Sequence, residues 1–144
     1  TILNEHIAHH QRLAKMYEKA LKGISGLSYH TNPDSRYESN YWLSCITLDE
    51  QVHVVGEEEV TIAPQPIAPN RNIEALRIYM DKAGIETRPL WKPMHLQPIY
   101  ADAPAYLNGV SEHLFRIGLC LPSGPMVTDE DFEYIISTLK EAIK

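Results

Sequence analysis

Apolar residues recur every three or four positions over the first part of the chain, which is the spacing of an amphipathic helix. The stripe consists of Leu3, Ile7, His10, Ala14, Tyr17, Leu21 and Ile24. We expect this helix to end at about Lys22, because Gly23 and Gly26 follow and glycine commonly ends helices.

Two shorter helices are predicted in the middle of the chain. The first begins at Asn70 or Asn72, whose side chains can cap a helix, and ends at Gly84. Its apolar face consists of Ile73, Leu76, Met80 and Ala83. The second spans residues 110–117, and Asp102 can cap a further short helix before it.

The last helix has a clear start signal. Thr128 is a suitable N-cap residue, and carboxylates in the first turn interact favourably with the positive end of the helix dipole. Those carboxylates belong to Asp129, Glu130 and Asp131. The periodicity predicts a buried face formed by Phe132, Ile135, Ile136, Leu139 and Ile143.

Aromatic and β-branched residues predict a small sheet. Residues 41–48 predict one strand, residues 52–55 are expected to pair back against it, and residues 119–121 predict a short buried strand. Between the second strand and the next helix, residues 57–69 predict a loop that contains Pro64, Pro66 and Pro69. The fold class is therefore α+β, with one domain over residues 1–144 and a mostly antiparallel sheet packed by helices.

A proline-rich segment, residues 86–100, is called the proline arm here. Its prolines fix their own backbones and disfavour helical angles in the residue before each. We expect a stiff, extended arm on which Leu90, Met94 and Leu96 point inward. The opposite face would carry Trp91, His95 and Gln97. Recognition of a polar ligand and a plain connector packed on the core are equally compatible with this pattern.

Composition limits the partners of the chain. Its 144 residues include 13 basic and 19 acidic ones, a net charge of −6 with no basic cluster, which disfavours nucleic acids and anionic membranes as partners. No apolar run reaches the length of a membrane span. Cys45 and Cys120 lie far apart in the sequence without a CxxC motif, so neither a disulfide framework nor a zinc ribbon is predicted, and a reducing cytoplasm fits best.

Candidate chemistry within the chain is sparse. His6 and His10 sit one helical turn apart, as metal ligands can, but no third ligand is evident and a hydrogen-bonded core histidine is the commoner state for His10. Ser123 lacks the flanking glycine of a nucleophile elbow and fits a turn. Both cysteines fit core positions. The sequence therefore predicts no catalytic residue and no metal site.

Three segments together resemble the C-terminal part of the DegT-type sugar aminotransferases, pyridoxal-phosphate enzymes of the aspartate aminotransferase fold, fold type I. They read SNYWLS at 39–44, AGIETRPLWKPMHLQP at 83–98 and LCLPSGPMVTDED at 119–131. The middle segment is the most specific. The resemblance covers almost the whole chain, and only residues 52–69 are longer than is usual.

The resemblance implies a division of labour. The family transfers an amino group, usually from glutamate, to a keto sugar carried on a nucleotide, and pyridoxal phosphate forms a Schiff base with a lysine. That lysine, the phosphate cradle and the acidic partner of the pyridine nitrogen belong to the family's large domain, and none is found here. The chain would then be the small domain, without bound cofactor and inactive alone, in an enzyme that is a homodimer when intact.

The resemblance also implies substrate-facing residues. His95 matches a small-domain histidine that faces the cofactor and the sugar. Trp91 and Lys92 match positions on the same arm that can touch the substrate, and Arg88 leads into it. Two further candidates lie near the domain interface, namely Asn40 and Tyr41.

The alternative is a stand-alone, non-catalytic α+β module that binds a small ligand or a protein. A module that acts alone is expected to bury the whole stripe of the first helix. A severed domain is expected to expose part of that stripe, or the face around His95 and Trp91. Because a long helix follows Thr1 directly, we expect the chain to be a piece of a longer protein.

Overall fold

The computed structural model describes residues 1–62, 64–65 and 67–144 and has the expected α+β architecture. The helices are α1 (Ile2–Leu21), α2 (Arg71–Lys82), α3 (Val110–Ile117) and α4 (Asp129–Ala142). The strands are β1 (Leu27–Tyr29), β2 (Ser44–Leu48), β3 (Arg88–Pro89) and β4 (Gly118–Leu121). Three short 3₁₀ helices are η1 (Glu57–Glu59), η2 (Met94–Leu96) and η3 (Pro98–Tyr100).

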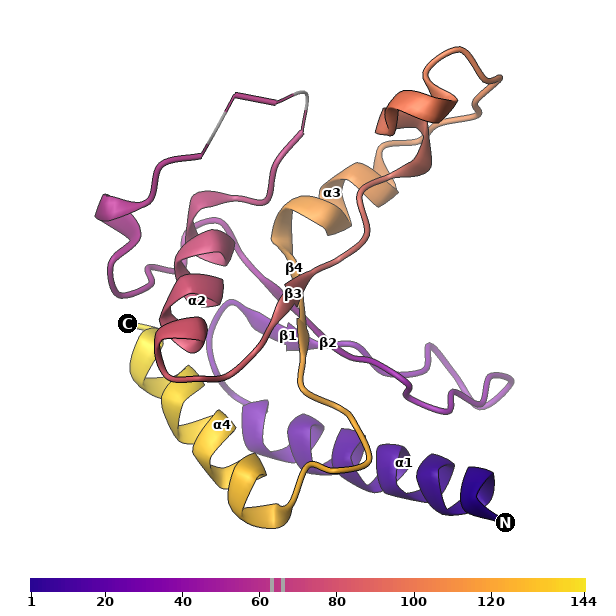
Figure 1. Cartoon of the computed structure of the whole chain (residues 1–144), viewed down its shortest axis with the longest axis vertical. Helices are drawn as coiled ribbons and strands as arrows, with labels where there is room; N and C mark the ends of the chain where they lie inside the picture. Colours follow the sequence, from indigo (N-terminus) through magenta and orange to yellow (C-terminus); the bar gives the residue numbers. More distant parts are fainter. Residues whose placement is uncertain (63, 66) are drawn as a thin grey trace.

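The four strands form one antiparallel sheet in the order β1-β2-β4-β3. Side chains alternate between its two faces, and in β2 Ser44, Ile46 and Leu48 are buried while the residues between them are half-buried. The buried face packs against α1, α2 and α4, which lie together in Figure 1. The predicted antiparallel sheet is confirmed for the strands at 41–48 and 119–121, which correspond to β2 and β4. The edge strands β1 and β3 are not predicted, because three and two residues give too short a pattern.

Helix α1 is buried only along its second half. Leu13, Tyr17 and Leu21 lie in the core, and the Tyr17 hydroxyl donates a hydrogen bond to the Pro122 carbonyl at 2.8 Å. At the other end Leu3 is 66% exposed, and Figure 1 shows that end of the helix extending beyond the sheet. The predicted stripe therefore meets the core at its C-terminal half and leaves apolar side chains uncovered at its N-terminal half.

Helix α4 begins as predicted. The Thr128 hydroxyl accepts a hydrogen bond from the Asp131 N–H, and the Asp131 carboxylate accepts one from the Thr128 N–H, which together form a capping box. Hydrogen bonds from the Thr128 side chain and backbone lower the pKa of the Asp131 carboxyl. The predicted apolar face is confirmed for Phe132, Ile135, Ile136 and Leu139, which are buried. Its last member, Ile143, follows the end of the helix and is half-buried.

The expected pairing of residues 52–55 with the strand before them is wrong. Val54 instead forms an isolated antiparallel bridge with Ile143, at the C-terminal end of α4. The Asn72 side-chain amide donates hydrogen bonds to the Asp49 and Val52 carbonyls, so it holds the turn after β2 and does not act as the helix cap. Asn70 occupies the N-cap position of α2 without a side-chain capping bond.

The proline arm is extended only at its start. Arg88 and Pro89 pair with β4, whereas η2 and η3 coil the remainder into 3₁₀ turns. The strict alternation of faces is therefore wrong, and Met94, expected to point inward, is 60% exposed. No helix begins at Asp102 among the described residues; η3 ends just before it.

The segment between β2 and α2 is confirmed as a largely irregular connection. It contains η1 and the described residues Pro64 and Pro69, while Pro66 lies outside the described residues. Across the described part of the chain, no helix combines the length and the apolar character that crossing a membrane requires.

Candidate functional site

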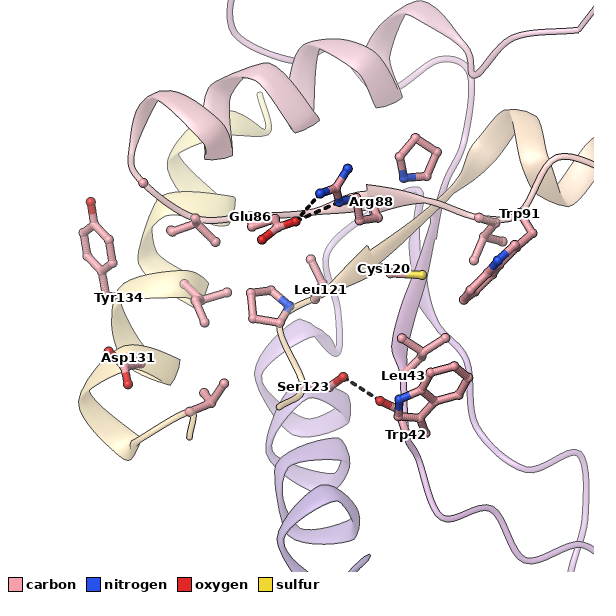
Figure 2. Close-up of a pocket in the computed structure, with 17 residues that line it drawn as sticks. Trp42, Leu43, Glu86, Arg88, Trp91, Cys120, Leu121, Ser123, Asp131 and Tyr134 are labelled. Atoms are coloured by element: carbon pink, nitrogen blue, oxygen red, sulfur yellow. Dashed lines mark hydrogen bonds and ion pairs between the residues drawn. The ribbon is translucent and has the colours of Figure 1, made fainter. Parts of the chain in front are cut away.

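A pocket of about 960 Å³ lies between the start of the proline arm, the end of β4 and the start of α4. Its lining residues come from four parts of the chain and are Trp42 and Leu43, then Gly84, Ile85, Glu86, Arg88, Pro89, Leu90 and Trp91, then Cys120, Leu121, Pro122 and Ser123, and finally Val127, Asp131, Tyr134 and Ile135 (Figure 2). Most lining residues are apolar or aromatic. The charged residues among those described are Glu86, Arg88 and Asp131. Such a mixture of apolar surface and a few charges is typical of sites for small organic ligands.

Two exposed tryptophans, from distant parts of the sequence, meet at one side of this pocket. The ring centroids of Trp42 and Trp91 lie 6.3 Å apart, with 42° between the ring planes. They are 64% and 66% exposed. Exposed tryptophans in contact are common at binding surfaces, because the indole is apolar but carries an N–H donor.

Local turns position Trp42. The Asn40 side-chain oxygen accepts a hydrogen bond from the Trp42 N–H at 3.1 Å, and the buried Ser123 hydroxyl donates to the Trp42 carbonyl at 2.8 Å. Ser123 therefore connects the segment before α4 to the segment that leads into β2. Ser123 lies in the connection before α4, as predicted, directly ahead of the turn at Pro125 and Met126. The sequence does not predict its contact with Trp42.

Arg88 lies on the edge strand β3, where its side chain reaches the pocket. Its guanidinium forms an ion pair with the Glu86 carboxylate, and its Nε donates to Glu86 Oε1 at 2.8 Å. Because both side chains are exposed, water screens this pair and it contributes little to stability. The guanidinium can therefore exchange its partner for a ligand anion at low cost.

His95 lies outside this pocket. It sits on η2, and its Nε2 lies 2.8 Å from the Glu112 carboxylate on α3. The imidazole is 16% exposed. A neutral imidazole held this way carries its proton on Nε2 and leaves Nδ1 as an acceptor. Glu112 was not singled out in the sequence, because nothing local links it to a residue 17 positions away.

The face expected beside His95 does not form as predicted. The Gln97 side-chain amide donates to the Lys92 carbonyl at 2.9 Å and thereby closes the turn around η2. Gln97 therefore stabilises the arm, and Lys92 is half-buried. Trp91 and Arg88 share the pocket, whereas Lys92 and His95 are not among its lining residues.

The two remaining candidates lie near one another at the entrance to β2. Tyr41 has a φ of +48°, a strained value for a residue with a side chain, and its hydroxyl accepts a hydrogen bond from the Asn32 N–H at 3.2 Å. Tyr41 lines a separate pocket of about 330 Å³ that also includes Gln11. Asn40 is exposed. That any of the six candidates touches a substrate stays a prediction.

The histidines of α1 do not form the hydrogen-bonded core arrangement expected for His10. The Nε2 atoms of His9 and His10 are buried without a hydrogen-bond partner, and the ring centroids lie 6.1 Å apart. Burial, together with the charges of His9 and His6, lowers the pKa of His10. No group of three potential metal-binding side chains occurs within the described residues.

The pocket does not fit covalently bound pyridoxal phosphate. That cofactor requires a lysine for its Schiff base and a cradle of donors for its phosphate. No lysine is among the described residues that line the pocket, and Arg88 is the one cationic side chain there. The site can bind an apolar, aromatic or anionic group, but it does not contain the reactive amine.

Comparison with known proteins gives a consistent result. EpsN of Bacillus subtilis (strain 168), provisionally named a pyridoxal phosphate-dependent aminotransferase, is 29% identical over 142 residues, which cover 96% of this chain and 31% of EpsN. GDP-perosamine synthase of Caulobacter vibrioides is 23% identical over 98% of this chain and 33% of its own length. The chain thus spans about a third of the length of these curated relatives.

A solved structure shares the fold. The aminotransferase TlmJ from Streptoalloteichus hindustanus superposes with a TM-score of 0.71 at 19% identity, over 94% of this chain and 31% of TlmJ. The family model for the DegT/DnrJ/EryC1/StrS aminotransferases matches residues 1–140. Since this match covers nearly every residue, the chain belongs to the DegT/DnrJ/EryC1/StrS aminotransferase family.

Proposed function

We propose that the chain is the C-terminal small domain of a pyridoxal-phosphate-dependent aminotransferase that acts on a nucleotide-linked keto sugar. The observation that carries this proposal is the group formed by Trp42, Trp91 and Arg88 at the mouth of the pocket. Family membership supplies the reaction class. The name of the GDP-perosamine synthase relative supports a sugar nucleotide as the substrate class.

Each residue of this group offers a contact suited to such a ligand. An exposed indole can cover the face of a sugar or a base. The Arg88 guanidinium can donate paired hydrogen bonds to a diphosphate once it leaves Glu86. Around η2, the free Nδ1 of His95 can accept a hydrogen bond from a sugar hydroxyl while Glu112 holds the ring. Lys92, Asn40 and Tyr41 are the further substrate-facing candidates.

The chemistry itself belongs to the part of the enzyme that this chain does not match. Pyridoxal phosphate supplies the electron sink of the reaction, and we place its lysine, its phosphate cradle and the glutamate donor site in the large domain. The isolated chain is then inactive and holds no cofactor. The intact enzyme is proposed to be a cytoplasmic homodimer.

A stand-alone binding module is the competing interpretation. It accounts less well for the uncovered apolar side chains on α1, where Ile2 and Leu3 are exposed, and for the exposed Trp91. Apolar surface of this kind is expected where a further domain packs. We therefore favour the aminotransferase domain.

Nuclear magnetic resonance of the ¹⁵N-labelled chain tests the proposed substrate contact, because its two tryptophans give two indole N–H signals. Titration with a GDP-linked sugar is expected to shift the Trp91 signal saturably, and Arg88→Ala should weaken the titration. Trp42→Phe and Trp91→Phe assign the signals. Tyr37→Ala, which removes an exposed ring that does not line the pocket, is the control. Indole signals that stay unchanged at the highest ligand concentration would contradict the proposal.

A further inference from the structure

The two cysteines of the chain are 75 positions apart in sequence, but they lie next to each other on adjacent strands of the sheet. Cys45 on β2 and Cys120 on β4 are direct partners in the antiparallel register. Their Sγ atoms lie 3.7 Å apart, and both thiols are free. They point away from the helix-covered face, since the residues beside them in β2, Ser44 and Ile46, are buried there.

This arrangement suits a disulfide without movement of the strands. Directly opposed residues of an antiparallel pair have Cα atoms roughly 4.5–5.5 Å apart. Disulfides need Cα atoms about 4.4–6.8 Å apart. Rotation of the two side chains can therefore close the remaining distance between the sulfurs.

The two thiols differ in access and in acidity. Cys45 is half-buried, whereas Cys120 is buried and lines the pocket in Figure 2. Contact with the Cys120 thiol lowers the pKa of Cys45, and the same contact together with burial raises the pKa of Cys120. The more accessible sulfur is thus also the better nucleophile, because the thiolate is the reactive form.

We propose that Cys45 and Cys120 form a reversible intramolecular disulfide by exchange with a low-molecular-weight disulfide. The Cys45 thiolate attacks one sulfur of the oxidant, the oxidant's S–S bond breaks, and one small thiolate leaves. Cys120 then gives up its proton, attacks the Cys45 sulfur of the mixed disulfide and displaces the second small thiolate. In sum two protein thiols are oxidised, and one small disulfide is reduced to two small thiols.

The bond would join β2 to β4 covalently beside the pocket, since Cys120 lines the pocket and is the register partner of Arg88. Closing so long a loop restricts the unfolded chain, so the oxidised form should unfold at a higher temperature than the reduced form. This inference goes beyond the proposed function, since it requires neither a sugar substrate nor pyridoxal phosphate.

Incubation of the purified chain with oxidised glutathione, followed by alkylation and mass spectrometry, tests the proposal. Wild-type protein should lose two hydrogens, resist alkylation at both sulfurs and give a linked pair of tryptic peptides, 37–71 and 117–140. Reduction with dithiothreitol should separate the two peptides. Thiols that remain alkylatable, a stable glutathione adduct, or a disulfide between two chains would each overturn the proposal.

Two single variants separate the roles of the cysteines. Cys120→Ser should accumulate glutathione on Cys45, because no second thiol resolves the mixed disulfide. Cys45→Ser should react several-fold more slowly, because Cys120 is buried. Equal reactivity of the two variants would overturn the assignment of Cys45 as the attacking thiol. Circular dichroism checks the fold of each variant. If a variant does not fold, the peptide map of the wild-type protein still tests whether the disulfide forms.

Discussion

The side chains of Tyr17 and Tyr29 make the stability of the protein depend on pH. Tyr29 stacks on Tyr17 with 6.1 Å between ring centroids, and its hydroxyl donates to Ser44 Oγ at 3.2 Å. Burial, partly offset by the hydrogen bond to Ser44, raises the pKa of Tyr29 to about 12. The same kind of burial raises the pKa of Tyr17 still further. Both hydroxyls therefore stay protonated in the folded state at alkaline pH.

Stability should consequently fall between about pH 10 and pH 12. An unfolded tyrosine ionises near pH 10, so over this window the unfolded chain loses protons that the folded chain retains, which favours unfolding. The contribution of Tyr29 is fully present below pH 10 and disappears as the pH approaches 12. Urea unfolding at a series of alkaline pH values should give a shallower decline for Tyr29→Phe than for wild type. Parallel declines in the two proteins would contradict the raised pKa.

At the scale of elements, the junction between α3 and β4 requires glycine at position 118, because there is no space for a side chain there. A Cβ on Gly118 would overlap the side chain of Leu90 and would lie 2.6 Å from the Leu114 carbonyl oxygen. Gly118 thus lets the proline arm pack directly on the start of β4, which positions Trp91 beside the pocket.

Gly118→Ala is expected to destabilise the fold by roughly 1–3 kcal/mol, the usual cost of forcing extra atoms into a packed site. Gly124→Ala is a matched control, because a Cβ there meets no atom within 4 Å. Urea midpoints of the two variants measure the difference. If both variants unfolded at the wild-type midpoint, the close packing of the arm on β4 would be refuted.

The same elements show what the sequence can and cannot predict. Helical periodicity predicts α1, α2 and α4, because each buries a face that repeats every three to four residues. The extended conformation predicted for the proline arm is wrong beyond Pro89, because the coiling of η2 is accompanied by a hydrogen bond from Gln97 to the Lys92 carbonyl that no sequence repeat indicates. The pairs His95–Glu112 and Cys45–Cys120 join different elements, so only the assembled fold brings them together.

The molecule as a whole has one continuous core but leaves several groups of apolar side chains exposed on its surface. Core residues from α1, α2, α4 and the sheet form one cluster. In contrast, the N-terminal half of α1, the tryptophan pair and the tip of the proline arm present apolar side chains to solvent. Figure 1 shows the arm and the end of α1 projecting from the body of the domain. If the proposed function is right, we expect the rest of the enzyme and the substrate to contact these projecting regions.

If the reactive amine lies in the large domain, pyridoxal phosphate should find no specific lysine on this chain. Reduction with borohydride after incubation with the cofactor should trap only weak labelling, spread over Lys15, Lys19, Lys22, Lys82, Lys92, Lys140 and Lys144. Peptide mapping by mass spectrometry measures the distribution. Lys92→Arg should leave total labelling nearly unchanged. Saturable, stoichiometric labelling of one lysine, with Lys92 on the arm the position to watch, would mean that this domain holds the cofactor itself and that the proposed division of labour is wrong.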